Sequence, residues 1–359
     1  MPRSHDPLFA PERKKHPTLT VILLLLIVLM IISLVLNHLN NSRVNLLRES
    51  VTVPTLPSSL ENFRILQISD LHGLYFGQRQ ERLAAAIESA RYDIVVVTGD
   101  ITGANGDIGA FLALADLFAG KTPVYFIPGD EDPNPLIAVP HPGNSPLADY
   151  ILAAQEHGAI YLDAPVPITR GKGTIWLSPE WAYTLDYEAS FAAMDARKAE
   201  LEGQAATPKR DAALAAVTYE LDQLERVRNA RREISESDIH IAVTHHPLQL
   251  SALQSLQEWT HTENDSYVRT VSLILAGHYV AGQWRLPLIG ALRAPLSAET
   301  GGDGWFPDDR KIVGLASFMS IPQYISPGLG VSAAIDLPPI RLFNTPAVTV
   351  LTLTTKLIH

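Results

Sequence analysis

Residues 65–72 read ILQISDLH, a short apolar run that ends abruptly in a carboxylate and an imidazole. A short apolar run of this kind is typical of a strand that is buried on both faces of a sheet. Asp70 and His72 follow it, two positions apart, so they can direct their side chains to one point. The stretch predicts a strand over residues 64–69 with functional groups at its C-terminal end.

The same pattern recurs four times along the chain. Further strands are predicted over residues 94–98, 124–128, 239–244 and 273–276, and the polar residues that follow them are Asp100, Asp130 with Glu131, His245 with His246, and His278. Asp and Gly often follow a strand as turn residues, so one such ending would mean little. Five indicate a site, because functional groups assemble at the C-terminal ends of strands in α/β sheets. Imidazole nitrogens with carboxylate oxygens suit manganese, iron or zinc. His246 could either reach a substrate or only pack beside His245.

Helical patterns lie between the predicted strands. Residues 79–90 and 108–119 have apolar side chains at helical spacing, and alternation of strands with helices indicates an α/β fold. Residues 186–234 break the rhythm as an inserted two-helix hairpin, in which Thr207-Pro208 is a start signal for the second helix. The hairpin is either a stabilising flap or a lid over a site. Beyond Gly282 we expect a second, antiparallel sheet segment that ends in a strand over residues 347–353.

Composition excludes several classes of protein. The chain has 359 residues, of which 47% are hydrophobic and 18% charged, and it has no cysteine. Disulfides, cysteine-ligated zinc, iron–sulfur clusters and a thiol nucleophile are therefore excluded. The formal charge of −10 argues against a nucleic-acid-binding surface.

The N-terminal region is predicted to anchor the chain in a membrane. Residues 18–36 form an apolar run that carries no charge and is long enough to cross a bilayer as a helix. Arg13, Lys14 and Lys15 precede it directly, so the positive-inside rule places residues 1–17 in the cytoplasm and the large domain outside, after a linker over residues 37–60. A cleaved signal peptide is the alternative, but the run is longer than a usual signal core and no small-x-small cleavage site follows it.

Three motifs together resemble the calcineurin-like metallophosphoesterases, and most closely a membrane-anchored bacterial subgroup of them. They are Ile68-Ser69-Asp70-Leu71-His72, the stretch GHYVAGQWRLP at residues 277–287, and Arg341-Leu342-Phe343-Asn344-Thr345-Pro346. The resemblance implies a four-layer α-β-β-α metallophosphoesterase sandwich over residues 61–355, with the helical insertion at residues 186–234.

The resemblance also implies a two-metal site. Carried over position by position, Asp70 and His72 hold the first cation, Asp100 bridges both, and Asp130, His245 and His278 hold the second. The cofactors would be divalent manganese, iron or zinc. In the family a metal-bound hydroxide attacks phosphorus in line while the two cations stabilise the developing charge.

The sequence departs from the family pattern at three positions. Asp130 stands in place of an asparagine ligand, which a carboxylate replaces well. Glu131 occupies the catalytic position of a histidine that binds the phosphate and protonates the leaving oxygen, and an ionised glutamate cannot donate that proton. Val280 stands where the second histidine of Gly-His-x-His would bind the first cation. The sequence therefore predicts one firm metal site and one weak one.

Two hypotheses about function follow. In the first, the protein hydrolyses a phosphoester or pyrophosphate bond of a phosphorylated small molecule or lipid-linked substrate, with activity weakened by Val280 and Glu131. In the second, it is a non-catalytic, membrane-anchored binding or scaffold protein. Metal content measured together with turnover distinguishes them.

Overall fold

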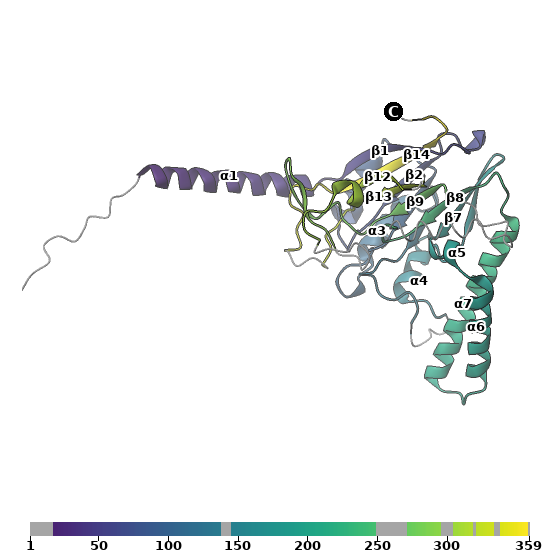
Figure 1. Cartoon of the computed structure of the whole chain (residues 1–359). Helices are drawn as coiled ribbons and strands as arrows, with labels where there is room; N and C mark the ends of the chain where they lie inside the picture. Colours follow the sequence, from purple (N-terminus) through teal and green to yellow (C-terminus); the bar gives the residue numbers. More distant parts are fainter. Residues whose placement is uncertain are drawn as a thin grey trace, which may run out of the picture. The chain divides into compact units, whose positions relative to one another are not determined.

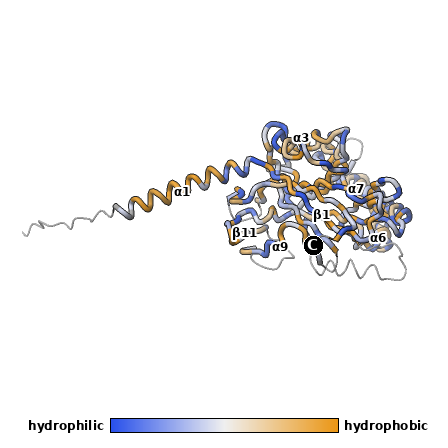
Figure 2. The backbone as a smooth tube through the Cα atoms, turned by 90° about the horizontal axis from the view of Figure 1, so that it is seen from above, coloured by the Kyte–Doolittle hydropathy of each residue, from blue (hydrophilic) through white to orange (hydrophobic). Residues whose placement is uncertain are grey.

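The computed structural model describes residues 17–137, 145–248, 271–295, 304–318, 321–333 and 338–357. The chain forms two compact units, residues 1–42 and residues 43–359. The first unit contains helix α1 (Pro17–Asn41), whose apolar composition is visible along most of its length in Figure 2. Its segment Thr20–Asn41, 22 residues long, has the length and composition that a bilayer crossing requires. The helix thus continues beyond the predicted limit at residue 36.

The first sheet of the second unit carries three of the five predicted strands. Its strand order is β1 (Asn45–Thr52), β14 (Ala347–Thr354), β2 (Arg64–Ile68), β3 (Ile94–Thr98), β4 (Val124–Ile127) and β5 (Ala159–Tyr161). Strands β2 to β5 run parallel, whereas β14 is antiparallel to β2 and parallel to β1. The C-terminal ends of β2, β3 and β4 therefore lie at the same edge.

The second sheet carries the other two predicted strands. Its order is β12 (Gly314–Phe318), β13 (Ile321–Ile325), β9 (Leu273–Ala276), β8 (Ile239–Val243), β7 (Gly173–Pro179) and β6 (Val166–Arg170). The four central strands are parallel and the outer pairs antiparallel. A separate antiparallel pair, β10 (Trp284–Leu286) with β11 (Gly290–Arg293), follows Gly282 as predicted. The strand predicted over residues 347–353 to end this segment is instead β14 of the first sheet. Figure 1 labels most of these strands.

The two sheets face each other across a shared core. Val96 of β3 and Ile241 of β8 belong to one buried cluster that draws on both sheets. Helices α2 (Glu81–Ile87), α3 (Gly109–Phe118) and α4 (Asp149–Glu156) pack on the outer face of the first sheet. Tyr183 of α5 (Trp181–Thr184) packs on the outer face of the second. The predicted α/β sandwich of metallophosphoesterase type is confirmed. The remaining short helices are η1 (Ser58–Leu60), η2 (Gln78–Gln80), η3 (Ala104–Gly106) and α9 (Asp309–Ile312).

The predicted hairpin is formed by α6 (Tyr187–Glu202) and α7 (Pro208–Glu233), which lie side by side in Figure 1. Asp186 caps α6 by accepting a hydrogen bond from the backbone of Ala189, and Thr207 caps α7 in the same way from Arg210. Pro208 at the first position of α7 is favoured there because its missing N–H would have no helical partner. These caps fix both helix starts where the sequence places them.

The structure differs from the sequence prediction between residues 37 and 60. This region is predicted as a linker, yet β1 pairs over its whole length with β14. The strand lies at the sheet edge, and most of its side chains are exposed. Because β1 lies at the edge of the sheet with most of its side chains exposed, it needs no alternation of apolar and polar residues. A search for apolar runs in the sequence therefore missed it.

Candidate metal centre

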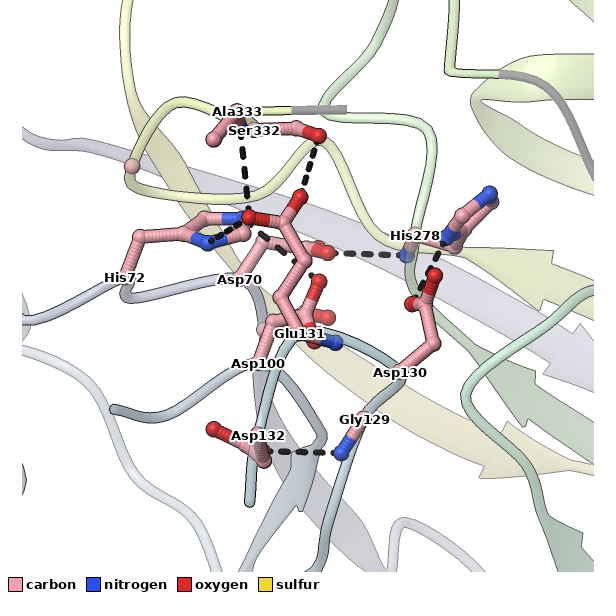
Figure 3. Close-up of polar contacts among 12 residues, drawn as sticks. Asp70, His72, Asp100, Gly129, Asp130, Glu131, Asp132, His278, Ser332 and Ala333 are labelled. Carbon is pink, nitrogen blue, oxygen red and sulfur yellow. Dashed lines mark hydrogen bonds and ion pairs between the residues drawn. The ribbon is translucent and has the colours of Figure 1, made fainter. Parts of the chain in front are cut away.

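The turns that follow five strands bring all six predicted metal ligands together at one edge of the two sheets. Their ligand atoms form two groups, and within each group all of these atoms lie within 4.8 Å of one another. The first group comprises Asp70, His72 and Asp100. The second comprises Asp130, His245, His246 and His278. The division matches the two sets that the family resemblance implies, and it adds His246, which the sequence left open. Figure 3 shows most of these side chains converging.

Asp100 lies between the two groups. Its Oδ2 atom is 3.6 Å from Nε2 of His72 and 3.2 Å from Nε2 of His245, although it belongs by position to the first group. Its other oxygen, Oδ1, accepts a hydrogen bond of 3.0 Å from the backbone N–H of Glu131. One carboxylate thus faces a histidine of each group, which is the arrangement needed to bridge two cations.

The second group is oriented by contacts outside it. Nδ1 of His245 donates to the carbonyl oxygen of Thr98 at 2.8 Å, which leaves Nε2 directed toward the group. That Nε2 lies 2.8 Å from Oδ1 of Asp130 and 3.3 Å from Nδ1 of His278. The same Asp130 oxygen is 3.3 Å from His278 and 3.5 Å from Nε2 of His246. Three imidazoles therefore surround one carboxylate oxygen.

Buried polar atoms without hydrogen-bond partners test whether the residues fit divalent cations. Oδ2 of Asp70, Nε2 of His72 and Nε2 of His278 are buried and have no such partner among the residues that the structure describes. An unpaired buried polar atom is costly, and native proteins rarely contain one without a ligand, water or strain to explain it. They are three of fourteen such atoms in the described part of the chain, and these three all belong to the predicted metal-ligand set, whose donor chemistry suits manganese, iron or zinc. The residues therefore fit the metal ions that the resemblance implies.

The backbone is held in unusual conformations at the same positions. Asp70, His72, Asp100 and His278 all have φ between 47° and 76°. Non-glycine residues adopt this region rarely, and such strain persists where the surroundings over-determine the fold, often at functional sites. Gly129 permits a related close approach, because a Cβ atom there would lie 2.1 Å from Oδ1 of Asp100.

Burial and neighbouring charges raise the pKa values of Asp70 and His245 and lower the pKa of His246. Burial raises the pKa of Asp70. Burial alone would lower the pKa of His245, but its contacts with Asp100 and Asp130 raise it well above its usual range. Burial, with the nearby His278 and His245, lowers the pKa of His246 to about 4. His246 is therefore neutral at pH 7, the form in which imidazole binds a metal.

Glu131 is hydrogen-bonded to the loop that contains Ser332 and Ala333, near the C-terminal end of the chain. Its carboxylate accepts hydrogen bonds from the hydroxyl of Ser332 and, at 3.2 Å, from the backbone N–H of Ala333. Oε2 also lies 3.6 Å from Nδ1 of His72. Figure 3 shows this side chain between the loop and His72. A catalytic role for Glu131 stays a prediction, whereas its observed contacts are those of a loop anchor.

Val280 is completely buried next to Asp70. A Cβ atom built on Gly328 would meet Cγ1 of Val280 at 2.9 Å and Oδ2 of Asp70 at 3.0 Å, so both flank the same glycine. Val280 also has a φ of 46°, which is strained for a β-branched residue. The side chain that replaces the expected histidine thus lies beside the unpartnered oxygen of the first group.

The motif around Arg341 and Asn344 holds the site loops together. The buried Arg341 guanidinium donates to the carbonyl oxygens of Asn344, Gly330 and Pro327. Asn344 in turn donates to the carbonyls of Val280 and Gly282. Burial lowers the pKa of Arg341 to about 9. This part of the motif is a clamp on two loops that border the first group.

Replacing Arg341 with alanine is expected to lower the free energy of unfolding by about 3 kcal/mol, because it leaves buried carbonyl oxygens without donors. Chemical denaturation of the full chain in detergent measures this loss. Arg310→Ala is the matched control, because Arg310 is exposed and, among the described residues, its side chain is hydrogen-bonded to Asp308 alone. Equal stability of the two variants would contradict the clamp.

Comparison with protein-family models assigns the chain to a known family. The model of the calcineurin-like phosphoesterases matches residues 63–281, more than half of the chain. The chain therefore belongs to the calcineurin-like phosphoesterase family. A solved structure of a phosphopantetheinyl hydrolase from Mycobacterium tuberculosis is also similar, with 15% identity, a TM-score of 0.32, and coverage of 74% of this chain and 89% of that one. A likeness of this extent carries no argument about activity. None of the curated proteins matches the sequence.

Proposed function

We propose that this protein is a metal-dependent hydrolase of phosphoester or pyrophosphate bonds. The observation that carries the proposal is the position of Asp100, whose Oδ2 atom faces His72 of the first group and His245 of the second. Family membership supports the same reaction class. Divalent cations bound at the two groups would supply an activated water and neutralise charge on the phosphoryl oxygens.

Seven side chains would hold the cations, and at least one backbone carbonyl group orients a ligand. Asp70, His72 and Asp100 would hold one cation, and Asp130, His245 and His278 the other, with His246 as a further ligand. Thr98 fixes the ring of His245 through its carbonyl oxygen. The rigid, strained turns after the strands keep these groups in place without reorganisation.

The leaving group must depart without help from the position of the family's catalytic histidine. Glu131 stands there, and its carboxylate is already bonded to Ser332 and Ala333. Loss of a general acid costs about 10²–10⁴ in rate, and the cost is smallest for a good leaving group. We therefore propose aryl phosphodiesters or pyrophosphates as the better substrates.

We also propose that the catalytic domain is exported and remains attached to the membrane by α1. The length and apolar composition of Thr20–Asn41 support an anchor, and the basic residues before it support a cytoplasmic N-terminus. A reporter enzyme active only outside the cytoplasm, fused after residue 359, should be active. Activity only of a cytoplasmic reporter at the same position would reverse the orientation.

Hydrolysis of bis-p-nitrophenyl phosphate by the full chain in detergent tests the activity. We expect turnover with added Mn²⁺, loss of turnover with a chelator, and recovery when Mn²⁺ is restored. Absence of metal-dependent turnover across phosphomonoesters, phosphodiesters and sugar-nucleotide pyrophosphates would contradict the proposal and favour a binding or scaffold protein.

A further inference from the structure

A cleft of about 310 Å³ opens beside the candidate metal centre, at the C-terminal ends of β4, β5, β7 and β8. Its lining comes from both sheets: Pro128 and Tyr161 follow or end strands of the first, and Trp181 of α5 follows β7 of the second. His245, a member of the second ligand group, also lines the cleft. The cleft and the candidate metal centre therefore have His245 in common.

Most of the residues that line the cleft are apolar, although polar and apolar atoms contribute almost equally to its surface, and one of these residues is a tryptophan. Seven of the eleven residues that line it are aliphatic, aromatic or proline residues. Trp181 supplies aromatic surface, whereas the ring of Tyr161 packs against Phe126 on the outer face of the first sheet. Aromatic rings pair favourably with other rings in edge-on or offset contacts. The volume is at the lower end of the range for small-molecule sites, so it suits a ring more than a long acyl chain.

The charges of the lining disfavour a second anionic group. None of the eleven residues that the structure places around the cleft is lysine or arginine, whereas Asp163 and Glu180 contribute carboxylates. Arg226 of α7 neutralises Asp163 from outside the lining, through two contacts of 2.7 Å, and Tyr219 also donates to Asp163. The hairpin thus supports one wall of the cleft, a role that differs from the lid considered from the sequence. An uncharged group fits this lining better than another phosphate.

We propose that this cleft binds the organic part of the substrate, and that this part is an uncharged group with a flat ring. The inference rests on the proposed function and narrows the two substrate classes proposed there to one: phosphoesters of uncharged aromatic alcohols, in preference to pyrophosphates or alkyl esters. A phosphoryl group held at the metal centre would have its substituent directed toward the cleft, because His245 belongs both to the ligand group and to the lining. Trp181 is the specificity residue, because it offers the largest aromatic surface there.

Binding of non-hydrolysable phosphonates to the Mn²⁺-loaded full chain tests the inference without requiring turnover. Calorimetry should show phenylphosphonate binding about tenfold more tightly than methylphosphonate, since a ring buried against aromatic residues adds that much affinity. In Trp181→Ala this preference should fall to within about twofold, whereas Trp181→Phe should retain most of it. Thermal melting confirms that each variant is folded.

A charged probe supplies a second, independent readout. 4-Carboxyphenylphosphonate should bind more weakly than phenylphosphonate, and Glu180→Gln should narrow that difference. Equal affinity for the phenyl and methyl compounds would overturn the inference. It would also be overturned if folded Trp181→Ala kept the preference for phenylphosphonate and Glu180→Gln kept the weaker binding of 4-carboxyphenylphosphonate. If any of these results is found and the original protein still hydrolyses bis-p-nitrophenyl phosphate, only the proposed substrate class is wrong. If no phosphonate binds and no turnover occurs, the proposed function fails as well.

Discussion

Asp100→Asn is expected to reduce metal-dependent hydrolysis of bis-p-nitrophenyl phosphate by at least about 10³-fold, because metal-ion catalysis contributes several kcal/mol to the barrier. The carboxylate faces a histidine of each ligand group. An amide has nearly the same shape, but it lacks the negative charge and can present only one oxygen. The variant should therefore bind less metal at both sites. Turnover and metal content, measured on the same preparation of the full chain in detergent, give the two readouts.

Asp132→Asn is the matched control for this experiment. Its carboxylate accepts hydrogen bonds from the backbone of Ile101, Thr102 and Gly129, so it joins the same two turns as Asp100. It belongs to neither ligand group. We expect Asp132→Asn to lower the melting temperature while keeping the metal content of the original protein. Wild-type turnover in folded Asp100→Asn would show that Asp100 does not bridge catalytic metals.

Val280→His is expected to increase the affinity of the first group for Mn²⁺ by at least about tenfold, within the range by which metal-site partners alter affinity. Val280 and the unpartnered Oδ2 atom of Asp70 flank the same glycine, so an imidazole at residue 280 can join Asp70 and His72. The exchange also removes a β-branched side chain from a φ of 46°. Titration of metal-depleted protein with Mn²⁺ measures the change, and hydrolysis should rise with occupancy of the first group.

Val280→Leu is the control for the change in volume at this buried position. Leucine fills space without offering a ligand atom, so it should leave the affinity for Mn²⁺ as it is in the original protein. Equal affinities in the histidine and leucine variants would mean that residue 280 does not border the first metal site.

Five central strands were predictable because they are buried on both faces, whereas β7, which is almost as buried, was not predicted. The strands β3 and β9 have the predicted bounds, and β2, β4 and β8 end one residue before the predicted limits. The strands β1, β5 and β6 lie at sheet edges and escaped prediction. Exposed positions of β1 and β6 carry polar residues, and β5 is only three residues long. The hairpin was predictable because Thr207 and Pro208 are a local signal for a helix start.

The convergence of the candidate ligands was predictable from the sequence because each of these residues follows a buried strand. The hydrogen bonding of Glu131 was not predictable, since its partner Ser332 lies 201 residues further along the chain and no local pattern connects the two residues. The cleft beside His245 was hidden for a similar reason, because four strands from two sheets contribute to it. Long-range packing of this kind leaves little trace in the spacing of residues.

Metal content measured together with turnover, on one preparation of the full chain, tests the central claim most directly. We predict at least one tightly held divalent ion per chain, a second that binds on addition of Mn²⁺, and hydrolysis of bis-p-nitrophenyl phosphate that follows metal occupancy. A folded protein that binds no divalent metal and hydrolyses no phosphoester would contradict the claim that Asp100 joins two catalytic metal sites.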